Sequence, residues 1–126
     1  MFSYPVQVLD NADRVIETLD LWVDTGSTYP WLPRELFDRL GVVPRRNYTF
    51  RLADGTRELK PVAQIRISLG GEPFATYCAA AGEEDALLLG AVALEEAGLA
   101  VDPIEKRLVP ADGYALTRLD VETPSP

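Results

Sequence analysis

Apolar and polar residues alternate along much of the chain with a period of two, which is typical of β-strands with one buried face. The clearest segments run from Val15 to Val23 and from Leu59 to Leu69. In the first, Leu21 and Val23 share one face and Trp22 lies on the other. Shorter apolar runs lie at Val6 to Leu9, Phe74 to Ala80 and Leu87 to Leu89. The pattern predicts an all-β fold.

Glycine and proline mark where these strands end. Asp54-Gly55 predicts a hairpin, because both central residues of such a turn tolerate positive φ, and Gly70-Gly71 predicts a second hairpin. Two short helices fit between the strands. The first has Pro33 at its first position and ends at Gly41, and the second spans Ala91 to Ala97.

The two halves of the chain resemble each other weakly. Val23-Asp24-Thr25-Gly26 leads to a helix that ends at Leu40-Gly41, and Leu88-Leu89-Gly90 leads to one that ends at Ala97-Gly98. Both halves therefore run apolar strand, glycine, short helix, glycine. On the residues alone this order fits either an internal duplication or any β-rich domain with two helices.

Length and composition limit the possible chemistry. With 126 residues the chain has room for one domain, which we place at residues 1–110, followed by a polar, proline-bearing tail at 111–126. Histidine is absent and Cys78 is the one cysteine. These counts exclude an internal disulfide, Ser-His-Asp and Cys-His hydrolases, and histidine-ligated metals. We expect no metal and no cofactor.

Charge and hydropathy bear on partners and location. Twelve basic and twenty acidic side chains give a net charge of −8, which disfavours binding to nucleic acid. No apolar run approaches the length of a membrane span, and the first residues lack the pattern of a signal peptide. We expect a cytoplasmic protein that binds neither nucleic acid nor membrane.

Asp24 is the residue that most suggests chemistry. It follows an apolar strand directly, where its carboxylate would be partly shielded from water, and such a charge needs hydrogen-bond donors. Thr25, Ser27 and Thr28 offer hydroxyls, and Gly26 allows a tight turn that brings its N–H close. The alternative is a plain turn after a strand, because Asp, Thr and Gly all favour turns.

Three segments together resemble a known family. Val23-Asp24-Thr25-Gly26-Ser27, the hairpin around Ala53-Asp54-Gly55-Thr56, and Leu88-Leu89-Gly90 before a helix are similar, in order, to the retropepsin-like aspartic proteases. The likeness runs from about residue 4 to 109. It implies a closed, barrel-like β-structure with two short helices and an internal pseudo-two-fold repeat.

The resemblance also assigns roles. It implies that Asp24 is catalytic, that Thr25, Gly26, Ser27 and Thr28 form the active-site loop, and that Ala53, Asp54 and Gly55 form a flap over a protein or peptide substrate. Two close carboxylates can share a proton, so that one acts as base and the other as acid. The chain has one Asp-Thr-Gly, so the second carboxylate must come from a second copy.

The leading hypothesis is therefore a homodimeric aspartic endopeptidase. Its rival is a catalytically silent dimerisation or peptide-binding module on the same fold, and a small-ligand barrel is a third alternative. The chain departs from the retroviral pattern at two places. Ser27-Thr28 follows where retroviral enzymes have Ala-Asp, and Ala91 stands where they have Arg. Those retroviral residues form an ion pair beside the dimer interface, so we expect an interface of different construction.

Other notable residues have structural interpretations. We expect Trp22 and Trp31 to pack against the core and Cys78 to be a small buried hydrophobe. Arg45-Arg46 is interpreted as a solvated pair at a turn, and Glu83-Glu84-Asp85 as an exposed acidic loop.

Overall fold

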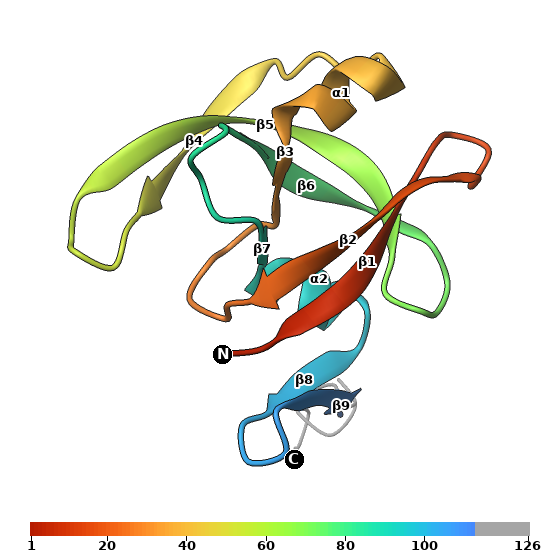
Figure 1. The fold of residues 1–126 in the computed structure, drawn as a ribbon, viewed down its shortest axis with the longest axis vertical. Helices are drawn as coiled ribbons and strands as arrows, with labels where there is room; N and C mark the ends of the chain where they lie inside the picture. Colours follow the sequence, from red (N-terminus) through yellow and green to blue (C-terminus); the bar gives the residue numbers. More distant parts are fainter. Residues whose placement is uncertain (113–126) are drawn as a thin grey trace, which may run out of the picture.

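The computed structural model describes residues 1–112, so most of the tail predicted at 111–126 lies outside the described residues. Within them the chain forms mainly β-strands, with two short helices (Figure 1). The strands are β1 (Ser3–Leu9), β2 (Val15–Val23), β3 (Trp31–Pro33), β4 (Arg46–Arg51), β5 (Arg57–Ser68), β6 (Phe74–Ala81), β7 (Leu88–Leu89), β8 (Leu99–Asp102) and β9 (Arg107–Pro110). The helices are α1 (Arg34–Leu40) and α2 (Ala91–Glu96).

The main sheet closes on itself. Its strand order is β1-β2-β7-β3-β6-β5-β4, and β1 also pairs with β5, so six strands form a ring and β4 extends from β5. β8 and β9 form a separate two-stranded sheet, which Figure 1 shows beyond α2. The predicted all-β class with two short helices is confirmed.

The ring contains an internal repeat with two-fold symmetry of pairing. Exchanging β1 with β5, β2 with β6, and β3 with β7 turns every strand pair of the ring into another pair of the ring. The residue registers follow the same symmetry. Trp31 pairs with Leu88 across the axis, Leu88 also pairs with Trp22, and Trp31 also pairs with Ala79. Trp22 therefore corresponds to Ala79, and Trp31 to Leu88.

The repeat differs in one respect from the one expected. The second-half segment Leu88-Leu89-Gly90 corresponds to β3 and the start of α1, not to the Asp24 loop. The counterpart of the Asp24 loop is the segment between β6 and β7. Because Trp22 corresponds to Ala79, the residues two positions further along also correspond, and these are Asp24 and Ala81. The sequence comparison failed here because β3 has three residues and too little periodicity to be recognised.

The alternating faces of the strands build the core as predicted. Leu21, Val23 and Ile67 are buried among the inward side chains of the ring, and Cys78 is buried with them. Burial raises the pKa of the Cys78 thiol, which fits its predicted role as a small hydrophobe. Trp22 is an exception to the predictions, because it lies on the outward face of β2 with 46% of its surface exposed.

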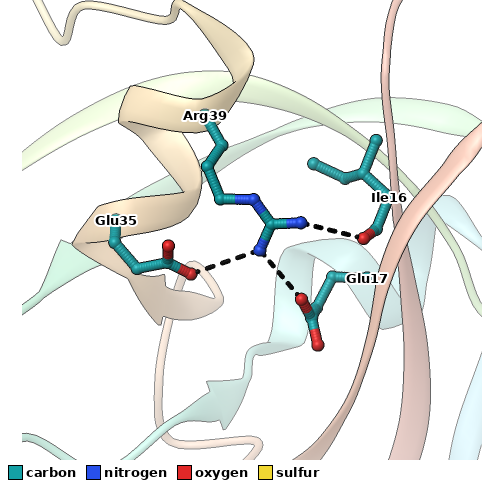
Figure 2. Close-up of polar contacts among 4 residues, drawn as sticks. All are labelled: Ile16, Glu17, Glu35 and Arg39. Atoms are coloured by element: carbon teal, nitrogen blue, oxygen red, sulfur yellow. Dashed lines mark hydrogen bonds and ion pairs between the residues drawn. The ribbon is translucent and has the colours of Figure 1, made fainter.

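Both helices are short and cover the ring. Leu36 and Phe37 of α1 are buried in the core. Figure 2 shows how Arg39 anchors α1 to β2: its guanidinium donates to Glu17 at 2.9 Å and to the Ile16 carbonyl at 3.1 Å. Within residues 1–112, no helix is long and apolar enough to cross a membrane.

Several boundaries differ from the predictions. The first helix begins at Arg34, with Pro33 as its N-cap residue, so Leu32 belongs to β3. The strands β8 and β9 were not predicted. In the β4–β5 hairpin Gly55 has φ of 89°, but Asp54 is not among the residues with positive φ. The loop there is a turn followed by a left-handed glycine, in place of the two-residue turn expected.

Candidate active site

Asp24 follows the parallel pair of β2 with β7. The pairing extends one residue beyond the strand, because the Asp24 N–H donates to the Leu89 carbonyl at 3.0 Å. This bond fixes the backbone of Asp24 against an apolar strand from the other half of the chain. Asp24 is partly buried, as the sequence predicted.

The loop after Asp24 folds back on the carboxylate. The Gly26 N–H donates to Asp24 Oδ1 at 2.9 Å, and the Ser27 N–H donates to the Asp24 carbonyl at 3.0 Å. A Cβ at Gly26 would lie 3.2 Å from Asp24 Oδ1, so glycine leaves room for this contact. The expected role of the hydroxyls is not seen: Ser27 donates to the Tyr29 carbonyl at 2.8 Å, and Thr25 is exposed.

The first residues of α2 donate hydrogen bonds to the loop that follows Asp24. The Ala91 N–H donates to the Ser27 carbonyl at 2.7 Å, and the Val92 N–H donates to the Thr28 carbonyl at 3.1 Å. Gly90 makes this approach possible, because a Cβ there would lie within 2.8 Å of backbone atoms of Ser27 and Tyr29. The two motifs singled out in the sequence are thus in direct contact.

A cleft of about 700 Å³ opens beside Asp24. One wall is the β4–β5 hairpin, which extends away from the ring in Figure 1, and the other walls come from the loop at residues 24–28, from Trp31 and from the segment before β7. The lining residues are Asp24, Gly26, Ser27, Thr28, Trp31, Tyr48, Thr49, Phe50, Arg51, Leu52, Ala53, Glu58, Glu84, Asp85, Ala86 and Leu88. The cleft therefore brings the loop at residues 24–28 together with the β4–β5 hairpin, which carries the predicted flap residues.

The tip of the hairpin is ordered by its own hydrogen bonds. The Gly55 N–H donates to the Leu52 carbonyl at 2.9 Å, and Asp54 Oδ1 accepts from the hydroxyl and the N–H of Thr56 at 2.6 and 2.9 Å. The Thr56 donors lower the pKa of Asp54. Of the three predicted flap residues, Ala53 lines the cleft, while Asp54 and Gly55 lie at the tip outside its lining.

One wall of the cleft was not anticipated from the sequence. Glu83 and Glu84 are exposed as predicted, but Asp85 is half-buried and its carboxylate lies 2.5 Å from the Lys60 ammonium. Lys60 also contacts Glu58 at 2.8 Å. Burial alone would lower the pKa of Lys60, but the two carboxylates outweigh burial and raise it. The alternation along β5 places Lys60 on the face of Gln64 and Arg66, opposite Ile67, and so does not predict this contact. The buried face changes within the strand, because Leu59 is 61% exposed and Val62 is buried.

Trp31 forms the back of that wall. It is 5% exposed and packs edge-on against Phe50, with ring centroids 5.1 Å apart. The Lys60 ammonium lies 5.3 Å from the centre of the Trp31 ring. The prediction that Trp31 packs in a core is confirmed, although the cluster it joins also lines the cleft.

A second cavity, of about 740 Å³, lies at the other end of β2, beside the β1–β2 turn and α1. Three arginines line it, and each is paired with a carboxylate: Arg14 with Asp10, Arg39 with Glu17 and Glu35, and Arg66 with Asp13. The Arg39–Glu17 and Arg66–Asp13 pairs join different segments, whereas Arg14–Asp10 lies within the β1–β2 turn. Because these arginines already have carboxylate partners, the cleft beside Asp24 is the candidate active site.

Comparison with known proteins identifies the family of this chain. A family model described as aspartyl protease matches residues 5–93, and the chain belongs to that family. The retropepsin-like aspartic protease of Rickettsia conorii, known from a crystal structure, is 16% identical, with 81% of this chain and 89% of that chain covered and a TM-score of 0.42. No curated protein sequence matches the chain. The family recognised from the sequence is confirmed.

Proposed function

We propose that this chain is a homodimeric aspartic endopeptidase whose catalytic dyad consists of Asp24 from each of two copies. The observation that carries the proposal is the position of Asp24, which is partly buried, held by backbone hydrogen bonds and open to a cleft of about 700 Å³. A hairpin with a glycine tip borders the same cleft.

The internal repeat supports the need for a second copy. The position in the second half that corresponds to Asp24 is Ala81, which has no carboxylate. Asp85 also borders the cleft, but the Lys60 ammonium and the Gly82 N–H engage its carboxylate. The full sequence has no other Asp-Thr-Gly. A two-fold axis beside Asp24 would supply the missing partner.

The chemistry follows from two carboxylates that share one proton. The ionised carboxylate removes a proton from water while the water oxygen attacks the scissile carbonyl carbon. The protonated carboxylic acid donates its proton to the carbonyl oxygen. When the tetrahedral intermediate collapses, the C–N bond breaks and the amine nitrogen takes a proton from the carboxyl group that accepted one. At the same time a hydroxyl of the intermediate returns its proton to the other carboxylate, which forms the carbonyl of the product and restores the single shared proton of the dyad. The proposed role of the hairpin residues Ala53, Asp54 and Gly55 is to cover the substrate and exclude bulk water.

Asp24→Asn tests this proposal, with Asp20→Asn as a matched control on the exposed face of the same strand. We expect the wild type and the control to cleave unstructured peptides in mild acid. Asp24→Asn should be folded and at least about 10³-fold slower, because it cannot act as base or acid. Cleavage would be followed by mass spectrometry from about pH 3 to 8, a range that brackets carboxylate titration.

Two results would contradict the proposal. Equal cleavage by Asp24→Asn would remove Asp24 from the chemistry. A wild type that cleaves nothing at any pH, but binds peptides as well as Asp24→Asn does, would favour the peptide-binding module.

A further inference from the structure

Lys60 connects the hairpin to the body of the protein at the cleft. It comes from β5, and its ammonium lies 2.8 Å from Glu58 Oε2 on the same strand and 2.5 Å from Asp85 Oδ2 on the segment before β7. The Lys60 side chain is 13% exposed. It is not part of the cleft surface, but its three partners Glu58, Asp85 and Trp31 all are.

The arrangement sets the charge of this wall. Glu58 and Asp85 both line the cleft, and Lys60 cancels one of their two charges while contacting one oxygen of each carboxylate. The other charged residues of the lining, apart from Asp24, are Glu84 and Arg51, which are exposed and opposite in sign. Lys60 is therefore the group that decides whether the wall attracts a cation.

Trp31 packs against the ion pairs, so that they form part of a packed wall of the cleft. Its ring lies beneath the Lys60 ammonium, and its Nε1 is buried without a hydrogen-bond partner among the described residues. Trp31 also lines the cleft, so its position links the ion pairs to the space beside Asp24. A cation on an aromatic face between two carboxylates is a favourable arrangement, and here a side chain of the protein supplies that cation.

We propose that Lys60 is a specificity-determining residue that makes this part of the cleft accept neutral side chains of the substrate. The inference rests on the proposed peptidase function. Without Lys60, Glu58 and Asp85 would be free to bind a basic side chain of the peptide. Lys60 acts through the two carboxylates and not on the reacting atoms, so it is a positioning residue and not a catalytic one.

The test compares peptides that carry lysine or norleucine, in turn, at each position near the scissile bond. Lys60→Met removes the charge and keeps an unbranched side chain. We expect it to raise the ratio of lysine to norleucine cleavage at one position by about tenfold or more, the effect of a charged hydrogen bond. Lys60→Arg should restore the wild-type ratio. Lys106→Met removes the other lysine of the chain and should leave the ratio unchanged.

Glu58→Gln provides an independent variant should Lys60→Met not fold. It leaves Lys60 with one carboxylate partner. It should therefore lower the ratio of lysine to norleucine cleavage and favour peptides with glutamate at the same position. A lysine ratio within twofold of the wild type at every position in both variants would overturn the inference.

Binding separates this inference from the proposed function. The same peptides would be titrated into Asp24→Asn and into Asp24→Asn with Lys60→Met, with calorimetry as the readout. A lysine preference that appears in binding while the wild type cleaves nothing would support the specificity role and reject the peptidase function. Cleavage by the wild type without any change in preference in the Lys60 variant would support the peptidase function and reject the specificity role. Binding of neither peptide to any variant would overturn the inference.

Discussion

Two glycines support Asp24 for different reasons. At Gly26 a side chain would approach the Asp24 carboxylate at 3.2 Å, a contact that a small shift can relieve. At Gly90 it would meet the backbone of Tyr29 at 2.7 Å and the Ser27 carbonyl at 2.8 Å. Backbone held by hydrogen bonds on both sides cannot move aside cheaply, so Gly90 is the more restrictive position.

Gly90→Ala should therefore lower the free energy of unfolding by about 1–3 kcal/mol, the usual cost of overpacking. Gly71→Ala is the control, because a Cβ there meets nothing within 4 Å and the backbone is not left-handed. Urea unfolding followed by circular dichroism measures both. Equal stability of the two variants would show that α2 does not press against the Asp24 loop.

Asp85 gives the cleft wall a dependence on pH. Burial acts to raise the pKa of Asp85, but the Lys60 ammonium and the Gly82 N–H outweigh it, so the pKa is lower than in the unfolded chain. A lowered pKa contributes stability that is fully present above the unfolded value of about 3.9 and is lost as the pH falls through the folded pKa.

The wild type should accordingly be more stable than Asp85→Asn at neutral pH, by on the order of 1 kcal/mol for this partly exposed pair. The difference should shrink as the pH falls below about 4. Thermal unfolding midpoints of the two proteins between about pH 2 and 7 measure it. Asp20→Asn is the control, and a difference that stays constant across the range would contradict the assignment.

Among the elements, the β4–β5 hairpin combines a rigid base with a free tip. Its base is tied to the body through Lys60 and Asp85, whereas Gly55 at the tip has φ of 89° and nothing within 4 Å of a Cβ. Such a conformation costs a side-chain-bearing residue about 1–3 kcal/mol. In the proposed role of the hairpin as a flap, its tip would cover the substrate while its base stays in place.

Gly55→Val should slow peptide cleavage by tenfold or so while the protein stays folded, because strain at the tip alters the proposed flap. Gly70→Val is the matched control. Gly70 has φ of 97° in the β5–β6 turn, where a Cβ would make an ordinary 3.7 Å contact with the Tyr4 hydroxyl. Both variants should lose similar stability by thermal unfolding. Loss of activity in both, or in neither, would remove the hairpin tip from function.

The sequence predicted the long strands, the two short helices and the apolar run that forms β7, and it missed β3, β8 and β9. β2 and the second half of β5 show a period of two, and their buried faces are those expected, as Leu21 and Ile67 illustrate. The first half of β5 differs, because Leu59 is exposed and Val62 is buried. β3 and β7 have three and two residues. β3 pairs in parallel with β6, and β7 pairs in parallel with β2, so both pairings join segments far apart in the chain. Asp24 was predictable as a candidate because its motif is local in the sequence. The contact between Lys60 and Asp85 was not predictable, because it joins residues that only the closed ring brings together.

At the scale of the whole molecule, the charge of −8 on each chain opposes association of two copies. Exposed charges are screened by salt, so added salt weakens this repulsion. The proposed dimer should therefore bind several-fold more tightly at about 0.3 M than at about 0.02 M salt. Sedimentation equilibrium measures the dissociation constant. A protein that stays monomeric at high concentration in both conditions would contradict the dyad.

The outward position of Trp22 has a practical consequence. The chain has two tryptophans, and their surroundings differ: Trp31 is 5% exposed behind the cleft, and Trp22 is 46% exposed two residues before Asp24. Collisional quenchers such as iodide reach an exposed indole and spare a buried one. Intrinsic fluorescence can therefore separate two events in one unlabelled sample: quenching of Trp22 reports what covers the strand beside Asp24, and the unquenched emission of Trp31 reports the integrity of the fold.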